Sequence, residues 1–157
     1  MSVRTGLWIG LLTVLWMLVM GYTGWYLHPS LLNLFFLVIV IEVALIFRAL
    51  RITAPTRTYL QQVAAGTTMA VVAAVVIFCG SYLFTTVLFP NYFQDLQRVG
   101  REAMTQQGLP EAEIARRLEA AAAWQTPVRN ALQGVIGTVL TGVVASLVIG
   151  AFARKRG

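Results

Sequence analysis

Residues 131–153 read ALQGVIGTVLTGVVASLVIGAFA, an apolar run in which a small residue recurs at every fourth position. Positions four apart lie on one face of a helix, so these residues form a face with almost no bulky side chain. The small residues in this row are Gly134, Thr138, Gly142, Ser146 and Gly150. Glycines weaken a helix in water, but in a membrane small residues let helix backbones approach closely, and hydroxyls can hydrogen-bond between helices. We therefore predict a membrane-spanning helix whose small face packs on another helix.

The composition of the whole chain is typical of a membrane protein. Its 157 residues are 58% hydrophobic and 11% charged, and the mean hydropathy is +0.74. This balance is too apolar for a soluble domain and indicates several membrane spans in a single domain, residues 1–157. The formal net charge is +6, but most of the excess flanks the apolar runs, as membrane topology would place it. The expected environment is a lipid bilayer, and nucleic acid is not expected as a partner.

Four apolar runs predict an all-α fold with transmembrane helices at about residues 7–27, 31–50, 63–89 and 131–153. Thr5–Ile41 contains no Asp, Glu, Lys or Arg, and as one helix it would be about 55 Å long, too long for a bilayer core of about 30 Å. Pro29 suits the first turn of a new helix, so we expect two spans joined there by a tight hairpin. The third run begins with many small residues, which makes it the expected partner of the small face on the last run.

Residues 92–125 form a sizeable stretch that is compatible with water. Gly108 and Pro110 divide it into two predicted helices, because glycine commonly ends helices and proline begins them. Both helices are amphipathic, and acidic residues in the first turn of the second match the helix dipole. We predict a helical hairpin that serves as a docking surface; lying on the membrane or folding on its own bundle is the alternative. The residues expected at a partner interface are Ile114, Leu118 and Trp124.

Basic residues near the ends of the apolar runs predict the orientation of the chain. Seven of them lie in flanks that carry no Asp or Glu: Arg4, Arg48, Arg51, Arg57, Arg154, Lys155 and Arg156. The positive-inside rule counts Lys and Arg close to span ends and places them in the cytoplasm. Both termini are therefore expected to be cytoplasmic, and the hairpin of residues 92–125 is expected to be extracytoplasmic.

Glu42 is an acidic residue inside an apolar run. A carboxyl group within a span is costly and usually faces protein or water. In a structural interpretation, Glu42 lies near the cytoplasmic side and is satisfied by an arginine or by a hydroxyl such as that of Thr67 or Thr68. In a functional interpretation, it handles a proton or a cation. Arg48 follows six residues later, about 9 Å along the helix axis and on a different side, so a pair within the helix is not expected.

No arrangement typical of an enzyme or a metal site occurs in the sequence. The single histidine, His28, has no cysteine or carboxylate near it in sequence, and the single cysteine, Cys79, lies inside an apolar run. These residues cannot supply a zinc site or a Ser–His–Asp set. The glycines are not followed by the lysine and hydroxyl of a phosphate-binding loop. We therefore predict a protein that is not an enzyme, with no catalytic residue, no metal site and no cofactor.

Several motifs give the chain a resemblance to a known family. They are the entry to the third run, Arg57-x-Tyr59-Leu60-Gln61-Gln62-Val63-x-x-Gly66, its exit, Phe89-Pro90-Asn91-Tyr92-Phe93, the later Ala112-Glu113-Ile114-Ala115, and Thr126-Pro127 before the last run. In their order and spacing, over nearly the full length, the chain resembles the DUF4199 family of small bacterial membrane proteins. The resemblance implies a four-span integral protein of the bacterial inner (cytoplasmic) membrane, and it carries over no catalytic residues.

Two functions are compatible with these features. The first is a non-catalytic accessory or scaffold subunit that packs against a larger membrane complex or against itself, which the small-residue faces and the lack of reactive groups favour. The alternative is a component of a transporter or channel in which Glu42 is a proton or cation site. A homo-oligomer could then supply a ring of Glu42 carboxylates.

Overall fold

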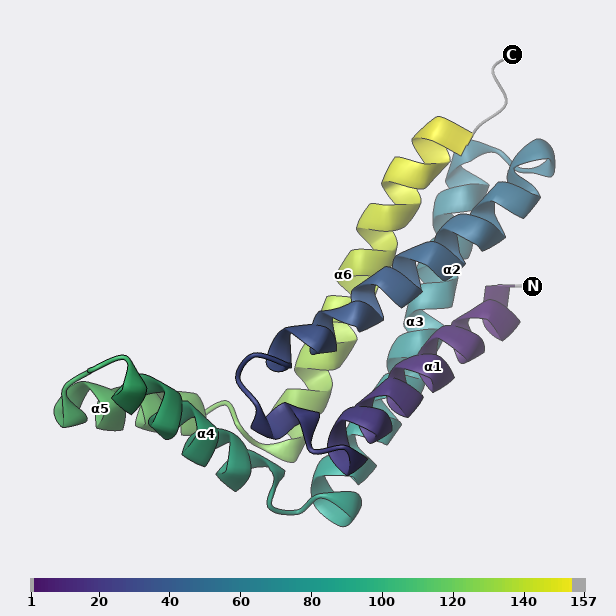
Figure 1. Cartoon of the computed structure of the whole chain (residues 1–157). Helices are drawn as coiled ribbons and strands as arrows, with labels where there is room; N and C mark the ends of the chain where they lie inside the picture. Colours follow the sequence, from purple (N-terminus) through teal and green to yellow (C-terminus); the bar gives the residue numbers. More distant parts are fainter. Residues whose placement is uncertain (1, 154–157) are drawn as a thin grey trace.

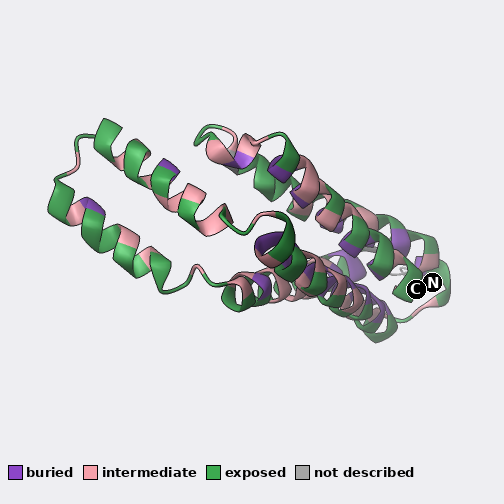
Figure 2. Cartoon of the chain, turned by 90° about the horizontal axis from the view of Figure 1, so that it is seen from below, coloured by how far each residue is buried: buried purple, intermediate pink, exposed green. Residues whose placement is uncertain are grey.

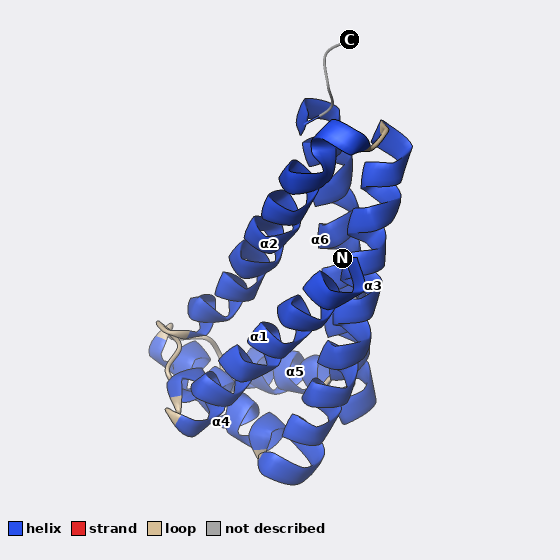
Figure 3. Ribbon diagram, turned by 90° about the vertical axis from the view of Figure 1, so that its right-hand side faces the viewer, coloured by secondary structure: helices blue, strands red, loops and turns tan. Residues whose placement is uncertain are grey.

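The computed structural model of the chain describes residues 2–153, and this part is helical apart from short turns (Figure 3). The α-helices are α1 (Ser2–Tyr22), α2 (Leu37–Thr53), α3 (Tyr59–Leu83), α4 (Tyr92–Gln106), α5 (Glu111–Ala122) and α6 (Pro127–Ala153). Helices α1, α2, α3 and α6 form an elongated bundle, and α4 and α5 form a hairpin at one end of it (Figure 1). The predicted all-helical fold is confirmed for this part of the chain. Arg154, Lys155 and Arg156, which contribute to the predicted orientation, lie outside the described residues.

Four helices within residues 2–153 are long and apolar enough to cross a membrane. Including the short helical turns that extend them, they cover Ser2–Tyr22, Asn33–Thr56, Tyr59–Leu88 and Pro127–Phe152. These helices correspond to the four predicted runs, which shows that the chain has the elements of a multi-pass membrane protein.

The first connection is longer than the predicted tight hairpin at Pro29. Helix α1 ends at Tyr22, and two short 3-10 helices follow, η1 (Trp25–Leu27) and η2 (Leu32–Phe36). Gly24 explains the early end, because its φ of +69° lies in the left-handed region that favours glycine. The chain therefore leaves the α-helical path before it reaches the proline, and residues 23–27 do not belong to the first long helix.

Helix α3 has both ends defined by local sequence. Thr58 caps its start, because its hydroxyl accepts a hydrogen bond from the Gln61 amide while the Gln61 side chain accepts one from the Thr58 amide. At the other end a π-helical turn, η4 (Phe84–Leu88), leads to Pro90, which cannot continue the ladder of backbone hydrogen bonds.

Helix α3 lies at the centre of the bundle, where α6 packs along one side of it and α1 along another. Both contacts are close because glycines face bulkier residues. A Cβ added at Gly142 of α6 would lie 2.3 Å from the Ala70 Cβ of α3, and one added at Gly80 of α3 would lie 2.3 Å from a Val14 methyl of α1. Helix α2 packs mainly on α6 and only slightly on α3. The buried core between these helices includes Ile9, Ile46, Leu50 and Met69.

The α4–α5 hairpin extends away from the bundle and turns at Gly108 (Figures 1 and 2). Gly108 has a φ of +73°, which allows the tight reversal. Figure 2 shows the hairpin mostly exposed, and its buried residues are Val99 on α4 and Ile114 on α5. Ile114 is only 1% exposed in the isolated chain. The docking interpretation requires Ile114 to be exposed in the isolated protein, so this part of the prediction is wrong. Ile114 is a core residue of the hairpin.

Candidate functional site

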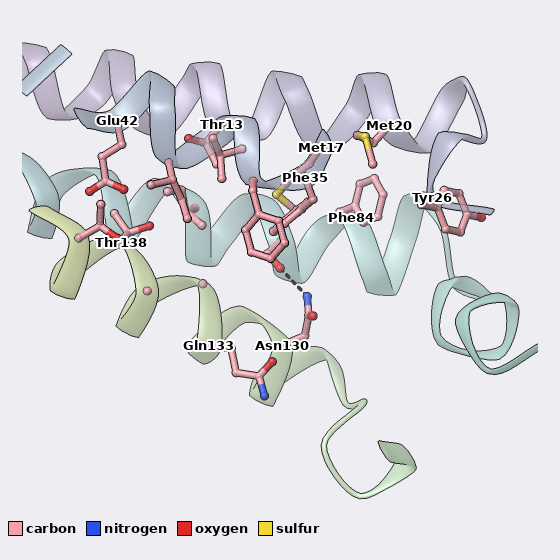
Figure 4. Close-up of a pocket in the computed structure, with 18 of the residues that line it drawn as sticks. Thr13, Met17, Met20, Tyr26, Phe35, Glu42, Phe84, Asn130, Gln133 and Thr138 are labelled. Atoms are coloured by element: carbon pink, nitrogen blue, oxygen red, sulfur yellow. Dashed lines mark hydrogen bonds between the residues drawn. The ribbon is translucent and has the colours of Figure 1, made fainter. Parts of the chain in front are cut away.

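A cavity of about 310 Å³ lies within the bundle, bounded by α1, α2, α3 and α6 (Figure 4). Helix α2 packs mainly on α6 and only slightly on α3, and the cavity lies between residues of all four helices. Most of its wall is apolar, with contributions from Met17, Met20, Phe35, Phe84 and Ile77. Ligand pockets in proteins are typically concave, largely apolar and about 300–1,000 Å³ in volume, with a few polar groups. The size and lining of this cavity therefore suit a small molecule.

Glu42 lies at one end of the cavity and is 4% exposed. Its Oε1 atom is buried without a hydrogen-bond partner among the described residues. Figure 4 shows the Glu42 side chain of α2 projecting toward α6, at the level of Thr138. The carboxyl group is close to the α6 backbone, since a Cβ added at Gly142 would lie 3.2 Å from Oε1.

The structural interpretation expects an arginine, Thr67 or Thr68 to satisfy Glu42. It is wrong for the Oε1 atom, which has no hydrogen-bond partner among the described residues. The reason lies in the packing of α2, which lies mainly against α6 and only slightly against α3, the helix that carries Thr67 and Thr68. Thr68 instead donates its hydroxyl hydrogen to the Ala64 carbonyl of its own helix at 2.8 Å. The Arg51 guanidinium lies over the Phe47 ring, 5.9 Å from its centroid.

Further polar groups follow Glu42 along the cavity. Thr13 and Thr138 are buried, and Asn130 donates a hydrogen bond to the Ser81 hydroxyl at 3.0 Å, as Figure 4 shows. No Lys, Arg or His side chain is among the described residues of the wall, and Glu42 is the one carboxyl group there. The cavity can therefore accept a hydrogen-bond donor or a positive charge, and it offers no counter-charge to an anion.

Aromatic residues close the end of the cavity that is nearest the hairpin. Tyr26, Phe84 and Tyr92 line this end; the ring centroids of Tyr26 and Tyr92 are 5.2 Å apart and those of Phe84 and Tyr92 are 5.4 Å apart. The Tyr26 hydroxyl donates a hydrogen bond to the Asp95 carboxylate at 3.1 Å. Burial, together with this bond, raises the pKa of Tyr26 to about 12. Asp95 belongs to the first turn of α4, so the hairpin is attached to the bundle at the covered end of the cavity.

We expect Tyr26→Phe to loosen this attachment. A hydrogen bond to a charged group contributes about 1.5 kcal/mol or more, so opening of the first turn of α4 should increase about tenfold. Amide hydrogen exchange at residues 92–97 measures that opening. Because the pKa of Tyr26 is raised in the folded protein, its contribution to stability is complete below the usual pKa of about 10 and is lost as the pH rises through about 12.

Tyr22→Phe is the matched control for this prediction. Tyr22 is 74% exposed and contacts the Phe89 ring, with 5.3 Å between centroids. Exchange in α4 should stay at the wild-type rate in this variant. Equal exchange rates in the two variants would show that the Tyr26–Asp95 bond does not hold the hairpin.

Of the remaining residues singled out from the sequence, Gly134 and Thr138 line the cavity and the others do not. Of the small residues on α6, Thr138, Gly142, Ser146 and Gly150 are buried and Gly134 is half-buried. Leu118 is half-buried between α4 and α5. Trp124 is 63% exposed and lies beneath the Arg129 guanidinium, with 5.3 Å to the ring centroid. A docking role for Leu118 and Trp124 stays a prediction.

Sequence reasoning missed several residues of the cavity, of which the polar ones are Thr13, Tyr26, Ser81, Asn130 and Gln133. A signal is present for all of these except Tyr26, because polar side chains inside or at the start of apolar runs usually face protein or water rather than lipid. Tyr26 has no comparable signal, since an aromatic residue near a span end is equally typical of the membrane interface.

Comparison with known proteins gives one match. The sequence model of a family described as "Protein of unknown function (DUF4199)" matches residues 4–155. No curated protein and no solved structure matches the chain.

Proposed function

The chain belongs to the DUF4199 family, and we propose that it is a multi-pass membrane protein that binds a small ligand in its cavity through Glu42. The observation that carries the proposal is the buried Oε1 atom of Glu42, which lines a cavity and has no partner among the described residues. An ionisable residue within the membrane is costly and is usually retained for function. The proposal starts from the predicted alternative, a transporter or channel component in which Glu42 is a proton or cation site, and replaces the proton or ion by a small ligand.

The energetic argument separates a binding role from a structural one. A buried polar group that has lost its hydrogen bonds to water costs about 1–3 kcal/mol unless a protein group replaces them. Buried polar groups in proteins nearly always have such a partner. For Glu42 the neighbouring helices supply none to Oε1, so the residue reduces the stability of the empty bundle. A bound ligand that carries a donor or a positive charge would remove this cost.

We place the protein in the cytoplasmic membrane of a bacterium, with both termini in the cytoplasm. The support is the family, together with the basic residues at the α2–α3 connection: Arg48 and Arg51 lie in the last turns of α2, and Arg57 lies between the second and third spans. The hairpin of α4 and α5 lies at the opposite end of the bundle from the α2–α3 connection (Figure 1). In this orientation the hairpin is extracytoplasmic, and the closed end of the cavity is on the same side.

An accessory role is a second candidate, and the exposed hairpin favours it. The hairpin extends beyond the bundle (Figure 2), and Trp124 at its end is largely exposed. In this function Leu118 and Trp124 would contact a larger membrane complex or a second copy of the chain. Deletion of residues 108–123 tests the role: a docking hairpin requires the shortened protein to insert normally and to lose its partners on copurification.

The binding proposal predicts that Glu42→Met stabilises the protein. Methionine fills a similar volume, and it removes the unpartnered oxygen, so the free energy of unfolding should rise by about 1–3 kcal/mol. Thermal unfolding in a mild detergent measures the change. If Glu42 has a structural role, Glu42→Met should instead lower the free energy of unfolding.

Ile46→Met is the matched control, one helical turn along α2. Ile46 is fully buried and apolar, so this exchange of one apolar side chain for another should lower stability by less than about 1.5 kcal/mol. If Glu42→Met destabilises the protein at least as much as Ile46→Met does, Glu42 is a structural residue and the binding proposal fails.

A further inference from the structure

We infer that the cavity takes an amphiphilic organic monocation, which enters sideways from the bilayer between α2 and α6 and places its charged head against Glu42. This ligand class rests on the proposed function, and it adds the charge, the shape and the route of the molecule.

The charge of the ligand follows from the charges of the wall. Glu42 is the one carboxyl group that lines the cavity, and no basic side chain of the described residues lines it. In a poorly solvated site an ion pair is much stronger than in water, and an uncompensated charge is correspondingly costly. One carboxylate therefore balances one positive charge. A second positive charge on the ligand would find no second carboxylate, and a negative charge on the ligand would find no basic side chain.

The chemistry of the positive head follows from the ligands that the wall can offer. Calcium takes six to eight oxygen ligands and magnesium needs an octahedral set that usually keeps waters. Around Glu42 the lining offers hydroxyl groups from Thr13, Thr138 and Thr141, without a second carboxylate. This set is poor for a strongly hydrated metal ion. An alkylammonium head needs only the opposite charge, which Glu42 supplies.

The rest of the ligand is predicted from the apolar wall. From Glu42 toward Tyr26 the cavity is lined by thioethers and aromatic rings, those of Met17, Met20, Phe35 and Phe84 (Figure 4). Methionine side chains adapt to irregular apolar shapes, and burying an alkyl or aryl group against such a wall is favourable. A head at Glu42 with an apolar body directed toward Phe84 would fill the long direction of the cavity.

The route is indicated by the exposed members of the lining. Phe36 is 61% exposed, Ile39 is 41% exposed, and Gly137 is also exposed. These residues belong to the spans Asn33–Thr56 and Pro127–Phe152. The mouth between them therefore faces the lipid chains, while Tyr26 and Tyr92 cover the end nearest the hairpin. A molecule that enters through this mouth must first dissolve in the bilayer, as an amphiphile does.

The test compares a cation with a neutral molecule of the same shape. The probes are 4-phenylbutyltrimethylammonium and its uncharged isostere, in which carbon replaces the nitrogen. Binding is measured by calorimetry on protein in phosphatidylcholine nanodiscs, with empty nanodiscs as the reference for partition into lipid. We expect the wild type to bind the cation about tenfold or more tightly than the isostere. Glu42→Gln should lose this preference and bind the isostere as the wild type does.

A second pair of variants shows whether the probes occupy the cavity. A Cβ added at Gly137 meets nothing within 4 Å, so Gly137→Leu should fold normally and fill the mouth, and both probes should lose binding. Ile136→Phe is the control, because Ile136 is 57% exposed and is adjacent to Gly137 in α6. This variant should bind both probes as the wild type does.

Each result has a distinct meaning. Equal binding of cation and isostere, abolished by Gly137→Leu, would overturn the monocation and leave the binding cavity in place. Unchanged cation binding in Glu42→Gln would also overturn the inference, because the head would then lie elsewhere. If neither probe binds the wild type, the ligand class is wrong, and the stability of Glu42→Met then decides whether the binding proposal fails with it.

Discussion

Gly142→Ile is expected to destabilise the folded protein by about 3 kcal/mol or more, the upper range for overpacking a close contact. A Cβ at this position would lie 2.3 Å from the Ala70 Cβ and 3.2 Å from Glu42 Oε1. The Ala70 Cβ cannot move away easily, since Ala70 is fully buried in α3. Helices α3 and α6 must therefore separate, and they lose van der Waals contact along the crossing. Thermal unfolding in detergent measures the loss.

Gly137→Ile is the matched control in the same helix. It lies on the row of α6 adjacent to Gly142, and an added Cβ there meets open space. The same substitution should change stability by no more than about 0.5 kcal/mol, as is typical of positions away from close contacts. Val143→Ile, beside Gly142 and half-buried, should also be mild. Equal destabilisation by Gly142→Ile and Gly137→Ile would show that α6 does not pack closely on α3 at Gly142.

Gly66→Ala should destabilise the protein by about 2–3 kcal/mol, because it overpacks the same interface from the α3 side. The new Cβ would lie 1.8 Å from the Ser146 Oγ and 2.7 Å from its Cβ. Rotation of the hydroxyl relieves the first contact and leaves the second. Ser146 is fully buried, and its hydroxyl already donates a hydrogen bond to the Gly142 carbonyl.

A second substitution should rescue this variant. Ser146→Gly removes both clashing atoms, although by itself it costs about 1 kcal/mol as a glycine in a helix. The double variant should therefore be more stable than Gly66→Ala alone, with a coupling energy of about 1–3 kcal/mol between two residues in contact. Ser146→Ala keeps the Cβ and should rescue less. Strictly additive effects of Gly66→Ala and Ser146→Gly would mean that the two residues do not meet.

The sequence predicts the close packing of α6 on α3, whereas the close packing of α1 on α3 was not predicted. The row of small residues on α6 and the alanines of α3 predict a close contact, and the structure places α6 along α3. The sequence carries a similar signal in α1, where Gly6 and Gly10 are four residues apart. Both glycines face α3, since added Cβ atoms would lie 2.8 Å from the Val72 Cβ and 2.6 Å from the Val76 Cβ. Two glycines in a run of large apolar residues form a weaker pattern than five small residues in a row.

Of the candidate site, the sequence could predict Glu42 but not the cavity that surrounds it. Glu42 stands out because a carboxyl group in an apolar run is rare and costly. The partner expected for it was a basic or hydroxyl group of a neighbouring segment, which is the usual arrangement for a buried charge. The cavity and its aromatic end at Tyr26 and Tyr92 depend on how α2 packs against α6 and α3. No local pattern of residues encodes that packing.

The number and order of the α-helices follow from the sequence alone, because span length, Pro90 and Gly108 act through local backbone geometry and through the thickness of the bilayer. The small face of α6 follows from the sequence in the same way. The burial of Ile114 within the hairpin and the position of Glu42 against α6 and a cavity are known only from the packing of the helices. Burial and hydrogen bonding between helices depend on which faces meet at each crossing. The same α2 packed on α3 would have brought Glu42 near different hydroxyls, with an identical local sequence.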